Sequence, residues 1–120
     1  MNLRKELEAK LQLLDVRLLK ARYGVSYTQE LVTKLINNTK EDLIKQVFIR
    51  KKIEINHINA LLIEYVKELS IYKRHREIIL ENPSRINKAI ELLDNLEDKV
   101  SNLIATLQAI AIVLESSEYN

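Results

Sequence analysis

The 120-residue chain contains no cysteine and no tryptophan, and it has only one glycine and one proline. The absence of cysteine excludes disulfide bonds, thiolate metal sites and a cysteine nucleophile. One glycine and one proline cannot supply the many turns of a β-sandwich or barrel, nor the glycine-rich phosphate loop of a nucleotide-binding α/β fold. The composition therefore predicts an all-α protein.

Long hydrophobic runs are also missing. The longest run, from Ala109 to Leu114, is much shorter than the roughly 20 residues that cross a bilayer. Charged residues begin at Arg4, which leaves no hydrophobic core for a signal peptide. We therefore expect a cytoplasmic protein that makes no contact with membranes.

Apolar residues recur at helical spacing along most of the chain. In the first segment they predict a helix over about residues 2–22, which Gly24 is expected to end as a C-cap. Ser26 and Gln29 form a capping-box pattern, which predicts a short second helix over about residues 27–37. The first third of the chain is thus expected to form two helices separated by a turn.

The remainder of the chain predicts two long helices. Apolar residues alternating at spacings of 3 and 4 predict a helix over about residues 40–81, with Thr39 as its start signal. Asn82-Pro83-Ser84 is the firm break, and a last helix follows over about residues 84–116. We expect one domain, residues 1–120, built as a helical bundle of two long antiparallel helices with the first two helices alongside them.

The last predicted helix is apolar on nearly all sides in its C-terminal half, where the exceptions are Thr106 and Gln108. A helix that is apolar all round must be buried all round, and a small bundle offers few such places. This pattern predicts a partner interface, which serves a dimer of this chain or another protein. The residues predicted to form the interface are Leu103, Leu107, Ile110, Ile112 and Leu114.

Two clusters of basic residues lie on the predicted helix 40–81 and suggest contact with the phosphates of a nucleic acid. The candidate nucleic-acid-binding residues are Arg50, Lys51, Lys52, Lys73, Arg74 and Arg76. A solvated helix surface explains the same clusters, and no aromatic residues are interleaved for base stacking. Lys51 and Arg76 also interrupt the apolar seam, so they either extend along the core or pair with acidic residues of a neighbouring helix.

The two histidines do not form a recognisable site. His57 and His75 are 18 residues apart, about 27 Å along a helix, so they cannot share a metal within one chain. Arg50 and His57 have a spacing that resembles the Arg–His element of the helical HEPN nucleases, which would imply phosphodiester cleavage. Such a pair also arises by chance in a basic helix, and we expect no metal, no cofactor and no catalytic residue.

The segment Leu18-Leu19-Lys20-Ala21-Arg22-Tyr23-Gly24-Val25-Ser26 resembles part of the helical effector-associated modules of bacterial signalling and defence proteins. In those modules a leucine-rich helix ends in an Arg-Tyr-Gly-(Ile/Val)-Ser turn, and the module recruits partners without catalysing a reaction. The chain departs from that pattern at Tyr27-Thr28, where proline is common. The resemblance implies an assembly role and assigns no functional residue.

Three hypotheses about function follow, in order of preference. The first is a non-enzymatic helical interaction module that self-associates or serves as a small subunit of a larger complex. The second is a nucleic-acid-binding small subunit of a ribonucleoprotein effector of the CRISPR type. The third is a HEPN-like nuclease. We expect no small-molecule substrate.

Overall fold

The computed structural model describes residues 2–118, and within this range it contains helices and no strands. The helices are α1 (Leu3–Asn38), α2 (Asp42–Arg74), the short α3 (Arg76–Leu80) and α4 (Pro83–Glu118). The three long helices pack together into a rod with dimensions of 61 × 21 × 16 Å. The prediction of an all-α helical bundle is confirmed.

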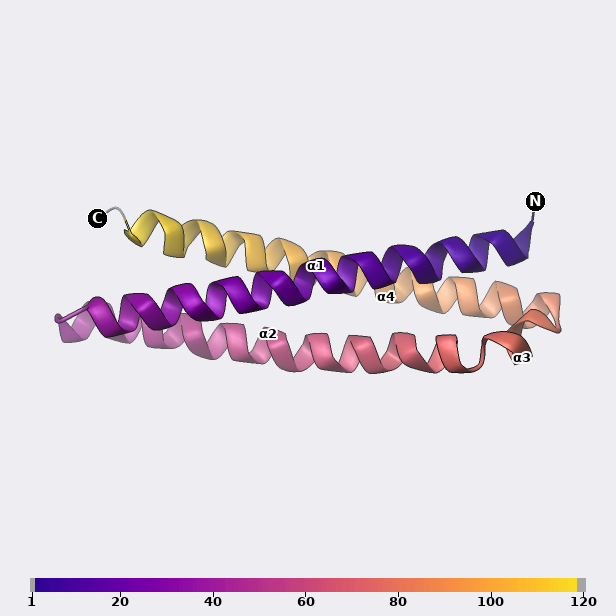
Figure 1. Ribbon diagram of the computed structural model, residues 1–120, viewed down its shortest axis with the longest axis horizontal. Helices are drawn as coiled ribbons and strands as arrows, with labels where there is room; N and C mark the ends of the chain where they lie inside the picture. Colours follow the sequence, from indigo (N-terminus) through magenta and orange to yellow (C-terminus); the bar gives the residue numbers. More distant parts are fainter. Residues whose placement is uncertain (1, 119–120) are drawn as a thin grey trace.

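α1 lies against both other long helices, and the α1–α4 contact is the most extensive in the fold (Figure 1). α2 runs antiparallel to α1, and α4 runs parallel to α1, so that α1 begins at the end of the rod where α4 also begins (Figure 1). Two hydrogen bonds define the parallel register: Arg17 donates to Ser101 and Lys34 to Glu118, each across 84 residues of sequence. The bundle therefore has three long helices where the sequence predicted two.

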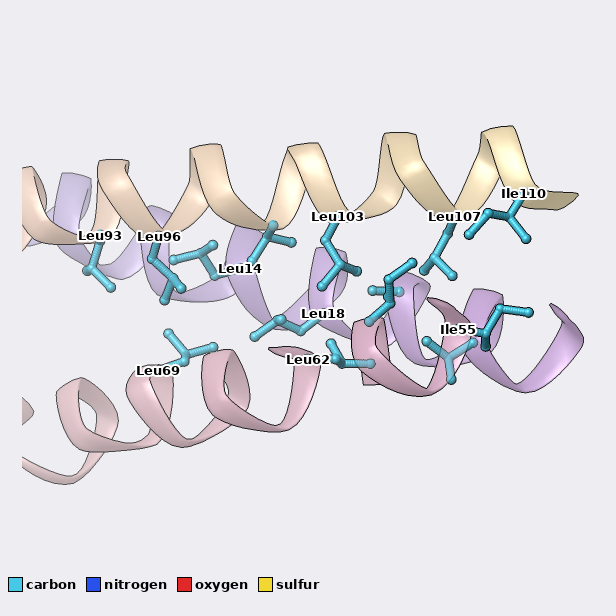
Figure 2. Packing of buried hydrophobic residues seen from close by; sticks show 14 of the residues in the cluster. Leu14, Leu18, Ile55, Leu62, Leu69, Leu93, Leu96, Leu103, Leu107 and Ile110 are labelled. Carbon is cyan, nitrogen blue, oxygen red and sulfur yellow. The ribbon is translucent and has the colours of Figure 1, made fainter. Parts of the chain in front are cut away.

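The core is one continuous cluster of aliphatic side chains from α1, α2 and α4. Leu14 of α1, Ile55 of α2 and Leu96 of α4 are each completely buried. Figure 2 shows such side chains from the three helices pointing toward one another in the central part of the bundle. Burial of this apolar surface, at roughly 25 cal/mol per Å², is the main force that holds the helices together.

The predicted helix end at Gly24 is wrong, because α1 continues through this residue to Asn38. Gly24 does not adopt a positive φ, so it is not a left-handed C-cap. The buried seam continues beyond it at Val25, Thr28 and Val32 with the same spacings of 3 and 4. Packing of that seam outweighs the cost of about 1 kcal/mol for a glycine within a helix. Ser26, predicted to begin a second helix, is an exposed residue inside α1.

Two other predicted helix ends are also wrong. Thr39 ends α1 and does not begin α2: it is the C-cap of α1, where its backbone N–H donates to the carbonyl oxygen of Ile36, and the N-cap of α2 is Glu41. The predicted helix 40–81 is interrupted at His75, which separates α2 from α3 although no glycine or proline lies nearby. Beyond this interruption, Ile79 and Leu80 of α3 pack against the core, so the break turns the chain back toward the bundle.

The break at Asn82-Pro83-Ser84 is confirmed. Pro83 is the first residue of α4, a position where its missing N–H group costs no hydrogen bond. The side-chain oxygen of Asn82 accepts a hydrogen bond from the backbone N–H of Ser84 at 2.8 Å. This contact satisfies one of the free donors at the start of α4.

Candidate interaction surfaces

Four of the five residues predicted to contact a partner lie in the core of the bundle. Leu103, Leu107, Ile110 and Leu114 are each at most 6% exposed. Figure 2 shows Leu103, Leu107 and Ile110 pointing from α4 toward α1 and α2. Their assignment to a partner interface is therefore wrong, because they belong to the core that α4 shares with α1 and α2. Ile110 and Leu114 lie level with the part of α1 beyond Gly24, which the predicted helix end at Gly24 did not include.

Ile112, the fifth residue, does project into solvent, and its side chain is 65% exposed. The neighbouring outward positions Ala105, Ala109 and Val113 are also exposed. No charged residue occurs between Val100 and Leu114. Between Val100 and Leu114 the outer side of α4 is therefore an uncharged surface, although four of the five residues predicted for it are buried.

α1 extends this surface with aromatic and aliphatic side chains. Tyr23 is 70% exposed, Val16 is 65% exposed, and Tyr27 lies one turn beyond Tyr23. Between α1 and α4 lies a crevice of about 100 Å³, lined entirely by residues of these two helices. We call the whole surface the α1–α4 face. Its residues are Val16, Lys20, Tyr23 and Tyr27 of α1 and Ala105, Gln108, Ala109 and Ile112 of α4, all of which are exposed.

The polar contacts that join α1 to α4 lie beside this face. Lys10 pairs with Asp94, and its Nζ lies 2.8 Å from an oxygen of Glu97. Hydrogen bonds from Lys10 to Asp94 and then to Glu97 raise the pKa of its ammonium group above the ordinary value of 10.5. Tyr27 also contributes, because its hydroxyl donates to Glu115 at 2.8 Å. These contacts hold the two halves of the α1–α4 face in one register.

A second apolar surface, on α2, was not predicted from the sequence. Positions at spacings of 3 and 4 lie on the side of α2 away from its core residues, and isoleucine occupies about half of them; Ile53 is 63% exposed. The surface, which we call the α2 stripe, comprises Ile49, Ile53, Asn56, Ala60, Ile63, Lys67, Ile71 and Arg74 of α2 and continues to Ile78 of α3. The spacing of these residues is present in the sequence, but the apolar seam that forms the core of the same helix is stronger and was the basis of the prediction.

The second basic cluster belongs to the contact between α1 and α2. Nζ of Lys73 lies 2.9 Å from a carboxylate oxygen of Asp15. Arg76 donates to the carboxylate of Glu8. Two of the six candidate nucleic-acid-binding side chains therefore bind α1. One of the two predictions for Arg76 was an ion pair with an acidic residue of a neighbouring helix. The structure contains such a pair, and its carboxylate, Glu8, belongs to α1.

The first basic cluster is more open to solvent. Lys51 pairs with Glu54 of its own helix at 3.4 Å. The remaining candidates are exposed and have no ion pair within residues 2–118; they are Arg50, Lys52 and Arg74. These three cations do not gather in one patch, because Arg74 is 24 residues, or roughly 36 Å, along the helix from Arg50.

The histidines remain separate from any group of ligands. His57 and His75 are both exposed. Across residues 2–118, no three His, Cys, Asp or Glu side chains are grouped so that they would hold a metal ion. Arg50 and His57 are exposed residues on one helix, and none of the crevices described in the structure includes either of them.

α4 is more hydrophobic over its length than the short uninterrupted apolar runs in the sequence indicate. By length and composition alone it could cross a membrane, because an 18-residue stretch has a mean hydropathy of 1.4. The buried helix of a soluble bundle meets the same criterion. In this fold α4 directs ten residues into the core that it shares with α1 and α2.

Comparison with known proteins finds no matching protein family, no matching curated protein and no matching solved structure. The resemblance to effector-associated modules rests on a turn at Arg22–Ser26, and this segment is helical in the structure.

Proposed function

We propose that the chain is a non-enzymatic helical interaction module that acts by assembling with other protein chains. The observation that carries this proposal is that large aliphatic and aromatic side chains, among them Val16, Tyr23, Ile53 and Ile112, are exposed along two surfaces, the α1–α4 face and the α2 stripe, outside the core. The α1–α4 face also carries Lys20, and the α2 stripe Lys67 and Arg74. Single exposed apolar residues are normal on soluble proteins, whereas contiguous apolar patches of several hundred Å² mark sites of association.

The chemistry of the α1–α4 face supports the same proposal. Tyrosine and isoleucine supply apolar contact area, and the tyrosine hydroxyl keeps a hydrogen-bonding group. Tyrosine is also enriched among the residues that dominate binding energy at protein interfaces. Tyr23, at 70% exposed, gains little stability for the isolated bundle and is available to a partner.

Photo-crosslinking in the cells that produce the protein tests this proposal. A photoreactive amino acid is placed at Tyr23 or at Ile63, and Asn87, an exposed residue of α4 outside both surfaces, provides the matched control. We expect an adduct of one discrete mass from Tyr23 or Ile63 and none from Asn87. If neither surface gives a discrete adduct, the chain does not function as an interaction module.

Binding of nucleic acid is the second candidate, and exposed Arg50, Lys52 and Arg74 favour it. Phosphate contacts of this kind weaken steeply with salt. Titration of a labelled single-stranded RNA at low and at physiological salt separates the two functions. Binding that persists at physiological salt and is lost in the triple alanine variant would favour the nucleic-acid function.

A further inference from the structure

We infer that the α1–α4 face binds the same face of a second copy of this chain, with the helices of the two copies antiparallel across a two-fold axis. This inference rests on the proposed function and names its partner. Charged residues make up 30% of the chain, yet among the eight residues that define the α1–α4 face only Lys20 is charged. The charges that border the face are paired or bonded within the chain, Arg17 with Glu97 and Glu115 with the hydroxyl of Tyr27. A two-fold interface places a surface against itself, so a face almost without charge avoids repulsion between like groups.

The register of α1 against α4 allows one axis to serve both helices. Residues of α4 lie level with residues of α1 that precede them by 84 positions, as the bond from Arg17 to Ser101 shows. An axis that passes beside Gln108 of α4 therefore meets α1 at the level of Gly24. Each helix then crosses its own copy at the same level of the rod.

The side chains on either side of this axis complement one another. On α4, the large Ile112 of one copy lies opposite the small Ala105 of the other, and Gln108 lies opposite itself. A glutamine amide carries both donors and an acceptor, so it can bond to its own copy. On α1, Lys20 lies opposite Tyr27, where an ammonium group over an aromatic ring is favourable. The single charge on the face thus meets a ring in place of a second lysine.

The size of the face predicts a weak dimer. It extends over about 18 Å of helix length and two helix diameters, or roughly 400 Å² of flat area in each chain. The pair would bury about 800–1,000 Å², which is at the lower limit of specific interfaces. We therefore expect dimers at about 100 µM protein and monomers on dilution.

The absence of cysteine makes a direct test available. Gln108→Cys places a thiol at the proposed axis, where the thiols of two copies meet. Asn87→Cys provides the control, because Asn87 is also an exposed polar residue of α4 and lies outside both surfaces. Under mild oxidation we expect the Gln108→Cys protein to form a covalent dimer several-fold faster than the Asn87→Cys protein. Equal rates, or faster cross-linking through Asn87→Cys, would overturn the inference.

A charge exchange tests the symmetry of the pair. Gln108→Glu and Gln108→Lys each bring like charges together at the axis, so each variant alone should dimerise about 100-fold more weakly than the unmodified chain. An equimolar mixture should recover dimers, as measured by sedimentation velocity. Gln108 is exposed, so both variants should retain the helical circular dichroism of the parent. Failure of the mixture to recover dimers would refute the two-fold pairing.

The outcomes also separate this inference from the proposed function. If the unmodified chain is monomeric at about 100 µM, self-pairing through this face is refuted. A monomer that binds phosphatidylcholine–phosphatidylglycerol vesicles through Ile112 also refutes it and assigns the face to lipid. If the in-cell adduct from Tyr23 contains a different protein, the second copy is refuted while the interaction module is retained.

Discussion

Replacement of Gly24 by alanine should stabilise the protein. Gly24 lies in the middle of α1 with an ordinary helical backbone, and a Cβ atom added there meets only Cδ1 of Leu107, at 3.4 Å. That distance is an ordinary van der Waals contact. Alanine restricts the unfolded chain more than glycine does, and a helix gains about 1 kcal/mol from the exchange. For a chain of this length the gain corresponds to a rise in Tm of about 4 °C.

Urea denaturation at low micromolar protein, followed by circular dichroism at 222 nm, measures the free energy of unfolding directly. Ala9→Gly, at an exposed position of the same helix, is the reverse control and should lose about 1 kcal/mol. If Gly24 ended a helix in the left-handed conformation, alanine would destabilise the protein by a similar amount. A loss of stability in Gly24→Ala would therefore refute the continuous helix α1.

Two further perturbations test the core and the α1–α4 contact. Leu93→Ala should lower the free energy of unfolding by about 3 kcal/mol, because Leu93 is completely buried. Leu92→Ala, at a position 36% exposed, should lower it by less than about 1 kcal/mol. Comparable losses of stability in the two variants, measured by thermal or urea denaturation, would contradict the assigned buried face of α4. The carboxylate partners of Lys10 raise its pKa, and burial and then the charge of Glu68 raise the pKa of Tyr72. The stability that these two groups contribute is therefore present below about pH 10. It is lost as the pH rises through their pKa values in the folded protein. A Tm that is constant from pH 8 to 10 and falls above pH 10, with a smaller fall in Lys10→Met, is the expected result, and equal falls in both proteins would contradict the role of Lys10.

The all-α class and the start of α4 could be predicted from the sequence because both depend on local signals. The single glycine and single proline limit the number of turns, and Asn82-Pro83 supplies both a cap and a residue suited to the first turn. The end of α1 could not be predicted in the same way. Gly24 signals a helix end locally, but the seam that continues through Val25 gains more from packing than the glycine costs.

The candidate surfaces depend on a property that the sequence expresses only indirectly, namely which side of an apolar helix another helix covers. Leu107 and Ile112 look alike in the sequence, yet the first is 4% exposed and the second 65% exposed. Their difference arises from packing, because Leu107 faces the core beside Gly24 of α1 and Ile112 faces away from it. The α2 stripe, in contrast, follows from a second periodicity that counting alone detects in Ile49, Ile53 and Ile63.

The parallel contact between α1 and α4 has a consequence for how the chain folds. The first and last long helices make the largest contact in the fold, so its formation must close a loop that contains the whole of α2. Contacts between distant parts of a chain form late and slow the folding of small proteins. During synthesis α1 and α2 can pair as a hairpin, but the side of α1 that receives α4 stays uncovered until α4 has emerged. At that stage we expect an exposed row of leucines and valines on α1, which makes the incomplete chain prone to aggregation until the last helix is in place.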